Sequence, residues 1–163
     1  MEIRIAQPDD LPALLDIYNY EVTHGTATFD LTEKSLAERK VWFDAHNRDN
    51  HPLLTACEGS EVLGYASLSP YREKEAYAGT VELSVYVAAA HRGKGVGRAL
   101  TAAILALARE DERTHCVVSV ITEGNEASVH LHESFGFTLS GVLHEVGYKF
   151  GKYLDILNYE LLV

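Results

Sequence analysis

The chain has 163 residues, of which 47% are apolar and 23% charged, and its formal net charge is −10. This length and balance are typical of one soluble domain with its own core and exclude a disordered chain. Nucleic acids and anionic membranes are recognised through excess Lys and Arg, so the charge excludes both and favours a small-molecule ligand. The opening MEIRIAQPDD lacks the parts of a signal peptide, and no long apolar run follows, which predicts a cytoplasmic protein.

The N-terminal third predicts one strand and two helices. The period-2 pair Ile3 and Ile5 indicates a short strand. Apolar residues then recur at helical spacing behind a capping Asp9 or Asp10, and a second helix is expected over Thr32–Ala45, capped by its first residue. The residues expected to face the core are Leu11, Leu14, Leu15 and Tyr18 in the first helix and Leu36, Val41 and Trp42 in the second.

The middle of the chain predicts a meander of strands. Leu53–Cys57 and Val62–Leu68 are strand-like and are separated by a Glu-Gly-Ser turn, which favours a hairpin. The next strand, Val81–Val87, alternates cleanly between an apolar face and a polar one. Its polar face consists of Glu82, Ser84 and Tyr86.

A glycine-rich loop and a helix with an apolar stripe follow this strand. A single strand-loop-helix-strand crossover after antiparallel neighbours predicts an α+β or α/β domain, a mixed sheet with helices packed on it. No repeat or linker interrupts the sequence, so we expect one domain over residues 1–163. The later elements are expected at Val96–Leu107 (helix), Cys116–Ile121 (strand), Glu126–Ser134 (helix), Thr138–Lys149 (strand) and Leu154–Leu162 (strand).

The two cysteines indicate no metal chemistry. Cys57 and Cys116 each lie in an apolar stretch and lack the close spacing of a metal site or a disulfide framework. We expect two buried thiols and no metal ion.

The glycine-rich loop is the segment with most chemistry. Its glycines let the backbone approach a ligand, and the helix that follows presents its N-terminus, so the loop suits a phosphate. The spacing excludes a Walker loop and a dinucleotide fingerprint. The alternative is a flexible basic turn. The loop reads Arg92-Gly93-Lys94-Gly95-Val96-Gly97-Arg98, with three cations in an otherwise acidic chain.

Two segments resemble motifs of the GNAT superfamily of N-acetyltransferases. Arg92-x-x-Gly95-x-Gly97 after a Val-Tyr-Val strand is similar to the acetyl-CoA pyrophosphate loop, and the segment from Asn125 to Phe137 is similar to the later cofactor segment. The runs Tyr77–Val87 and Gly147–Asp155 resemble the phosphinothricin and methionine sulfoximine or sulfone N-acetyltransferases. The likeness covers nearly the whole chain.

The resemblance implies a fold, a co-substrate and an assembly. The fold is a GNAT-like mixed, mostly antiparallel central sheet with helices packed on both faces. The co-substrate is acetyl-CoA, without a metal, and the acceptor is a small amino-acid-like molecule. A homodimer is expected, with the C-terminal strands as the contact.

The resemblance also assigns the cofactor contacts. The backbone of Val85, Tyr86 and Val87 would pair with the pantetheine arm, and the amides of Gly93 to Arg98 would hold the pyrophosphate. Asn125 would bind the pantetheine arm; as a helix N-cap it would instead bond the amide of Ser128, and the two roles are compatible.

Two side chains are candidates for proton transfer. An ammonium must lose a proton before it attacks a thioester, and the family places its general base at Glu82; the alternative is a solvated strand carboxylate. His132 stands where many GNAT enzymes carry Tyr and is a candidate acid for the leaving thiolate; the alternative is a structural histidine.

The acceptor contacts are the least determined. Arg72 and Lys149 are candidates for binding the carboxylate of an amino acid, or else they are surface charges. Phe29 and Tyr77 are candidate apolar walls, or else core residues. Alternatives for the whole protein are a GNAT that acts on protein N-termini or polyamines, and a non-catalytic acyl-CoA-binding module.

Overall fold

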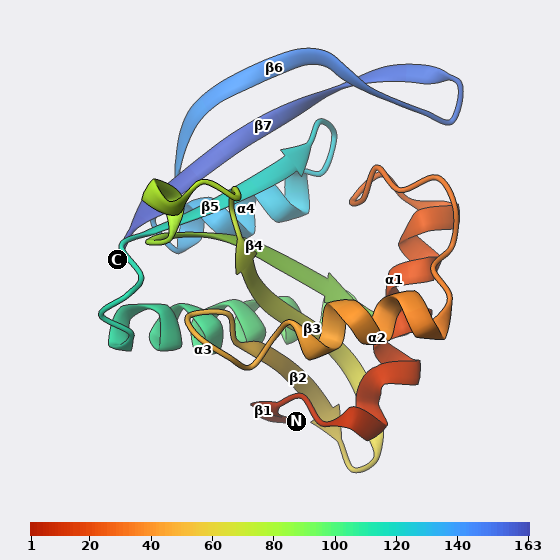
Figure 1. Cartoon of the computed structure of the whole chain (residues 1–163). Helices are drawn as coiled ribbons and strands as arrows, with labels where there is room; N and C mark the ends of the chain where they lie inside the picture. The colour runs from red at the N-terminus through yellow and green to blue at the C-terminus, as the bar shows by residue number, and fades with distance from the viewer.

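The computed structural model describes all residues, 1–163, and consists of one seven-stranded sheet and four α-helices (Figure 1). The strand order is β1-β2-β3-β4-β5-β7-β6, and every neighbouring pair is antiparallel except β4 and β5. The strands are β1 (Glu2–Ile5), β2 (Leu53–Glu58), β3 (Glu61–Pro70), β4 (Thr80–Val87), β5 (Cys116–Thr122), β6 (Thr138–Lys149) and β7 (Lys152–Leu162). The helices are α1 (Leu11–His24), α2 (Leu36–Asp44), α3 (Val96–Glu110) and α4 (Glu126–Ser134).

Helices cover both faces of the sheet, as the sequence predicted. Successive residues of a strand point to opposite faces. In β2, Leu53 packs in a cluster with Leu14 of α1 and Phe43 of α2, whereas Leu54 packs in another cluster with Leu100 of α3. The mixed, mostly antiparallel sheet with helices on both faces is therefore confirmed.

The expected aspartate cap of α1 is wrong in detail. Asp10 occupies the N-cap position but makes no capping hydrogen bond. Its carboxylate accepts hydrogen bonds from the guanidinium of Arg4 at 2.7 and 2.8 Å and from the amide of Gln7 at 2.7 Å. Asp10 thus joins β1 to the turn before α1. Along α1, Ile17 is buried and Leu15 only half-buried.

The prediction for α2 is wrong in start, cap and orientation. The helix begins at Leu36, and Ser35 forms a capping box with Glu38: the hydroxyl of Ser35 accepts from the amide of Glu38 at 3.2 Å, and the carboxylate of Glu38 accepts from the amide of Ser35 at 2.7 Å. Of the three side chains expected inside, Trp42 packs against the core cluster that includes Leu14 and Phe43, but the other two do not face the core. Leu36 and Val41, both expected inside, are 52% and 73% exposed, while Arg39 and Phe43 are buried.

The remaining elements lie close to their expected positions. The β2–β3 hairpin, β4, β5, α4 and β6 agree within two residues at each end, α3 runs to Glu110, and β7 starts two residues before the expected Leu154. Cys57 is buried as predicted, but Cys116 is only partly buried.

The contact between β4 and β5 is short and opens a gap in the sheet. The parallel pairing consists of Thr80–Cys116, Val81–Val117 and Glu82–Val118. After Glu82, β4 continues to Val87 and pairs only with β3 on its other edge. The backbone edge of β4 from Leu83 onward therefore faces the gap without a strand partner.

Candidate active site

A narrow cavity lies where β4 and β5 separate. Its lining includes Ser84 and Tyr86 from β4, and Asn125, Ser128 and His132 from α4 and its start. Two of the segments that the sequence assigned to acetyl-CoA thus meet at one place: the end of β4, and α4 with its cap Asn125. The gap gives an extended ligand access to an unpaired strand edge.

The glycine loop presents free backbone donors next to this gap. Gly95 is the N-cap of α3 at φ +83°, a left-handed conformation that favours glycine. No side chain caps the helix, and the amides of Gly97 and Arg98 have no acceptor within the protein. A Cβ at Gly97 would make ordinary van der Waals contacts, 3.6 Å from Val87 and 3.7 Å from Leu131. This helix terminus fits an anion such as a pyrophosphate.

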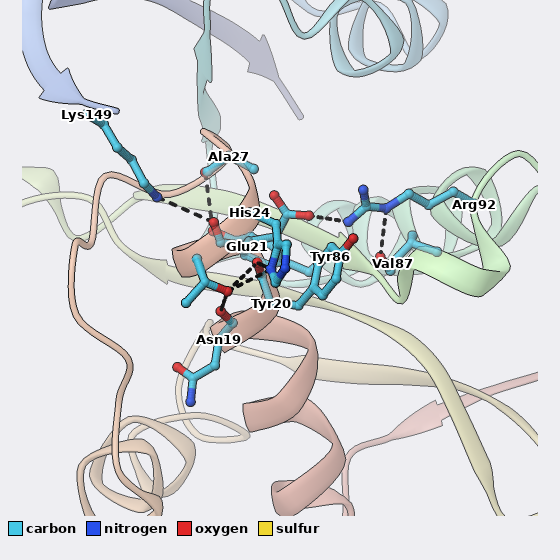
Figure 2. Close-up of polar contacts among 10 residues, drawn as sticks. Asn19, Tyr20, Glu21, His24, Ala27, Tyr86, Val87, Arg92 and Lys149 are labelled. Atoms are coloured by element: carbon cyan, nitrogen blue, oxygen red, sulfur yellow. Dashed lines mark hydrogen bonds and ion pairs between the residues drawn. The ribbon is translucent and has the colours of Figure 1, made fainter. Parts of the chain in front are cut away.

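The three cations of the loop do not converge on one point. Arg92 forms an ion pair with Glu21 of α1 and donates to the carbonyl of Val87 at 3.2 Å (Figure 2). Lys94 donates to a loop carbonyl at 2.9 Å, and Arg98 donates to the hydroxyl of Ser134 at 3.1 Å. The backbone amides, rather than these side chains, are therefore the free donors that the loop offers to an anion.

Asn125 is compatible with both of its predicted roles. Its side-chain oxygen accepts from the amide of Ser128 at 3.2 Å and so caps α4. Its side-chain NH₂ group makes no hydrogen bond within the protein, and the residue lines the narrow cavity. The capping bond therefore leaves the amide donors available to a ligand.

Glu82 has the environment of a base. It is half-buried on the polar face of β4, opposite Ser69 of β3, and its carboxylate has neither a hydrogen-bond donor nor a cationic partner in the protein. Burial raises the pKa of Glu82 above its ordinary value. A carboxylate with a raised pKa accepts a proton more readily than a solvated one does.

His132 is buried and bonded at both ring nitrogens. Nδ1 lies 2.7 Å from the carbonyl oxygen of Ser128, and Nε2 lies 2.8 Å from the hydroxyl of Ser119. Since a carbonyl only accepts, this network assigns the proton to Nδ1, and the Ser119 hydroxyl then donates to Nε2. Burial lowers the pKa of His132. The ring is therefore held as a neutral imidazole whose single N–H group already donates to the carbonyl of Ser128.

The four predicted acceptor residues form two separate pairs. Arg72 is exposed, with its guanidinium 5.8 Å from the ring centre of Tyr77. Lys149 is 2% exposed and donates to the carbonyls of Thr28 at 2.9 Å and Glu21 at 3.4 Å (Figure 2). Phe29 packs so tightly on Gly147 of β6 that a Cβ there would lie 2.2 Å from its ring. An acceptor carboxylate would have to displace two carbonyls to reach Lys149, whereas Arg72 is accessible.

The loop between α1 and α2 covers the gap and was not recognised in the sequence. The hydroxyl of Thr122 in β5 donates to the carbonyl of Thr26 at 2.6 Å. The hydroxyl of Tyr86 donates to the carbonyl of Ala27 at 3.5 Å. Together with the bond from Lys149 to Thr28, these contacts hold the loop over the end of β4. They join residues far apart in the chain, so no local pattern reports them.

A second cavity, also missed, has a volume of about 390 Å³ and lies between the polar faces of β3 and β4 and the helices α1 and α2. It shares Ser84 and Tyr86 with the narrow cavity. Arg39 of α2 lines it, a residue that was not among the side chains expected to face inward. The spacing of Arg39 and Trp42, which places a cation beside an aromatic ring on one helix face, is the signal that could have found it.

A further cavity carries none of the predicted site residues. A cavity of about 740 Å³ lies between the end of α3 and the segment from Asn47 to Pro52. No cluster of three or more His, Cys, Asp or Glu side chains is arranged to hold a metal ion. No helix has both the length and the apolar character needed to cross a membrane.

Residues 14–137 match the family model described as Acetyltransferase (GNAT) family. The chain belongs to the GNAT acetyltransferase family. An L-methionine sulfoximine/L-methionine sulfone acetyltransferase of Pseudomonas paraeruginosa is 45% identical over 98% of this chain and 92% of its own length. A phosphinothricin N-acetyltransferase of Streptomyces coelicolor is 43% identical over 98% of this chain and 95% of its own length.

Solved structures of GNAT proteins have the same fold. A ribosomal-protein-alanine N-acetyltransferase from Brucella melitensis has a TM-score of 0.96 at 43% identity and covers all of both chains. An acetyltransferase from Salmonella typhimurium, solved with its cofactor acetyl-CoA, has a TM-score of 0.94 at 37% identity, over 99% of this chain and 92% of that one. This GNAT protein is an acetyl-CoA-dependent N-acetyltransferase, with acetyl-CoA as its co-substrate.

Proposed function

We propose that this GNAT enzyme acetylates the free α-amino group of a small amino acid whose side chain resembles that of methionine sulfoximine, methionine sulfone or phosphinothricin. The names of the two relatives support this acceptor class. The observation that carries the proposal is the meeting of two cavities at Ser84 and Tyr86, beside the unpaired carboxylate of Glu82. One cavity opens along the free edge of β4, and the other opens under α1 and α2.

The geometry supports a direct transfer with Glu82 as the general base. Glu82, directly or through one water, takes a proton from the acceptor ammonium, and the amine nitrogen then bonds to the acetyl carbon. The carbon–sulfur bond breaks, the amide nitrogen releases its second proton and the thiolate takes one up. The free edge of β4 from Val85 to Val87 is proposed to bind the pantetheine arm, and the amides of Gly93 to Arg98 the pyrophosphate.

His132 is proposed as a structural group rather than as the acid. The neutral ring and its two hydrogen bonds fix the position of α4 against β5. A solvated thiol has an ordinary pKa of about 8.5, so the departing thiolate can take its proton from water near neutral pH.

Arg72 is proposed as the partner of the acceptor's α-carboxylate. It lies two residues after the end of β3, three residues beyond the Ser69 that pairs with Glu82, and its guanidinium is exposed. A guanidinium binds a carboxylate with two parallel hydrogen bonds.

Three further properties stay proposals. Residues 1–163 are proposed to act as one GNAT domain, since a single sheet includes strands from Glu2 to Leu162. A homodimer through the C-terminal strands is proposed because β6 and β7 expose many apolar side chains. A cytoplasmic location is the third proposal.

The test is a panel of acceptors scored by release of free CoA from acetyl-CoA. Methionine sulfone, methionine sulfoximine and phosphinothricin should be acetylated with a higher kcat/KM than polyamines or peptides with a free N-terminal alanine. Peptides are included among the acceptors because one relative of known structure is named a ribosomal-protein-alanine N-acetyltransferase. A preference for peptides or polyamines would contradict the proposed acceptor and leave the acetyltransferase activity intact.

A further inference from the structure

Arg39 is a buried cation without a counter-ion. It is 6% exposed, and its only hydrogen bond runs from Nη2 to the hydroxyl of Tyr65, at 2.7 Å. Its guanidinium stacks 3.4 Å from the ring centre of Trp42 and 4.2 Å from that of Tyr18. Nε is buried without any partner, and no carboxylate oxygen lies within 4.0 Å of the guanidinium. A buried charge is costly unless it is paired, so this arrangement points to a partner supplied by a ligand.

The guanidinium lines the cavity of about 390 Å³ between α2 and the sheet. The opposite wall carries three serine hydroxyls from β3 and β4, namely Ser67, Ser69 and Ser84. A guanidinium and hydroxyl groups together form a set of hydrogen-bond donors that suits an anionic or strongly polar oxygen.

The other charged groups of this cavity already have partners. Asp30 accepts from the hydroxyl of Tyr18 and lies 3.7 Å from Lys34. Burial, the largest cause, raises the pKa of Tyr18 to about 12, so this hydroxyl keeps its proton at neutral pH. Glu38 accepts from the amide of Ser35 in the capping box of α2. Arg39 is thus the cation of this cavity that lacks an anionic partner.

The strand register places Arg39 away from the reacting amine. Across the polar face, Ser69 is paired with Glu82, Ser67 with Ser84, and Tyr65 with Tyr86. Arg39 is bonded at the Tyr65–Tyr86 row, about 7 Å beyond the Ser84 row and about 13 Å beyond the Glu82 row at the usual strand rise. The amine nitrogen and carboxyl carbon of an amino acid are only about 2.5 Å apart. A carboxylate held near the amine therefore does not reach Arg39, whereas the end of a side chain does.

We infer that Arg39 is an acceptor-binding residue that recognises an oxyanion or oxo group at the end of the acceptor's side chain. This inference rests on the proposed function and adds a specificity-determining residue to it. The acceptor would lie along the polar face of β3 and β4, with its α-carboxylate toward Arg72, its amine beside Glu82 and Ser84, and its side-chain oxygens at Arg39.

The test compares two acceptors of equal length, methionine sulfone with two side-chain oxygens and norleucine with none. Wild type should prefer methionine sulfone, and Arg39→Gln should lower kcat/KM for methionine sulfone roughly 10- to 100-fold, as expected for a lost charged hydrogen bond. Norleucine turnover and the KM for acetyl-CoA should stay near wild type. Lys34→Gln, which removes a cation already paired in the same cavity, is the matched control and should leave the preference unchanged.

Equal losses for both acceptors in Arg39→Gln would overturn the inference, because a purely structural Arg39 acts on both alike. If this variant does not fold, the comparison is made with wild type alone. The same kcat/KM of wild type for methionine sulfone and norleucine would also overturn the inference. If wild type acetylates no amino acid, the proposed function fails, and calorimetric titration of wild type with each compound tests the inference separately. Tighter binding of methionine sulfone than of norleucine would then support the oxygen site, and equal binding would refute it.

Discussion

At the scale of single residues, Glu82 is proposed as the general base, and its buried charge is expected to lower the stability of the fold. Glu82→Gln keeps the size of the side chain and removes its basicity, so kcat should fall by about 10²- to 10⁴-fold while acetyl-CoA still binds. The loss should shrink as the pH rises, because more of the free amine arrives without its proton. Steady-state rates from pH 6 to pH 10, with the chemical step rate-limiting, measure this. A kcat near that of wild type at neutral pH would assign the base elsewhere.

The same substitution should not destabilise the fold. The pKa of Glu82 in the folded state lies above its unfolded value because burial penalises the charged form. The ionised carboxylate therefore costs free energy once the pH rises above the folded pKa, and this cost disappears below the unfolded pKa. Glu82→Gln should unfold at an equal or higher temperature than wild type at pH 8, with the difference vanishing at pH 4. Calorimetry that finds a clearly less stable variant at pH 8 would reveal an unseen favourable contact.

Arg92 and Glu21 form an ion pair whose two members differ in burial. The side chain of Arg92 is 50% exposed and that of Glu21 only 9%. Arg92→Met leaves a buried carboxylate without its cation, whereas Glu21→Gln leaves a cation that water can solvate. Thermal unfolding should therefore show a larger loss of stability in Arg92→Met than in Glu21→Gln. The reverse order would mean that the pair is not formed in solution.

At the scale of elements, the left-handed conformation of Gly95 sets the direction in which the amides of the glycine-rich loop point. The residue caps α3 at φ +83°, where an added Cβ meets no protein atom within 4 Å. Gly95→Ala should weaken acetyl-CoA binding in a calorimetric titration, because the strained loop no longer aims its amides at one point. Gly59→Ala, in the β2–β3 turn at φ +60° and equally open, carries the same strain far from the loop and is the control. Equal affinities in the two variants would remove the pyrophosphate from this loop.

Elements with a strong local pattern were predictable from the sequence. The alternation of β4 placed Glu82 on the polar face, and the stripe of α3 placed Leu100 in the core. The start of α2 was not predicted correctly, because two plausible caps, Thr32 and Ser35, stand three residues apart. Only Ser35 has a glutamate, Glu38, at the spacing of a capping box. Arg39 was not among the side chains expected to face inward, so the cavity that it lines was not predicted.

At the scale of the whole molecule, the site depends on contacts that no local pattern contains. The order of the strands places β4 beside β5, and the three-residue length of their pairing creates the gap. The resemblance to a family predicted that the backbone of Val85 to Val87 pairs with a ligand, whereas hydrophobic periodicity alone predicted only a mixed sheet. The bonds of Lys149 to the carbonyls of Glu21 and Thr28 likewise join residues that lie 128 and 121 positions apart in the chain.

The long β6–β7 hairpin extends along one edge of the molecule (Figure 1) and exposes apolar side chains that a monomer leaves in water. Leu143 and Val146 of β6 are 50% and 52% exposed. If these strands form the proposed dimer contact, Leu143→Lys combined with Val146→Lys should bury charges in it and shift sedimentation from dimer to monomer. Val41→Lys, at a side chain of α2 that is 73% exposed, is the control and should leave the dimer intact. A wild type that sediments as a monomer, or a charged variant that stays dimeric, would contradict the contact.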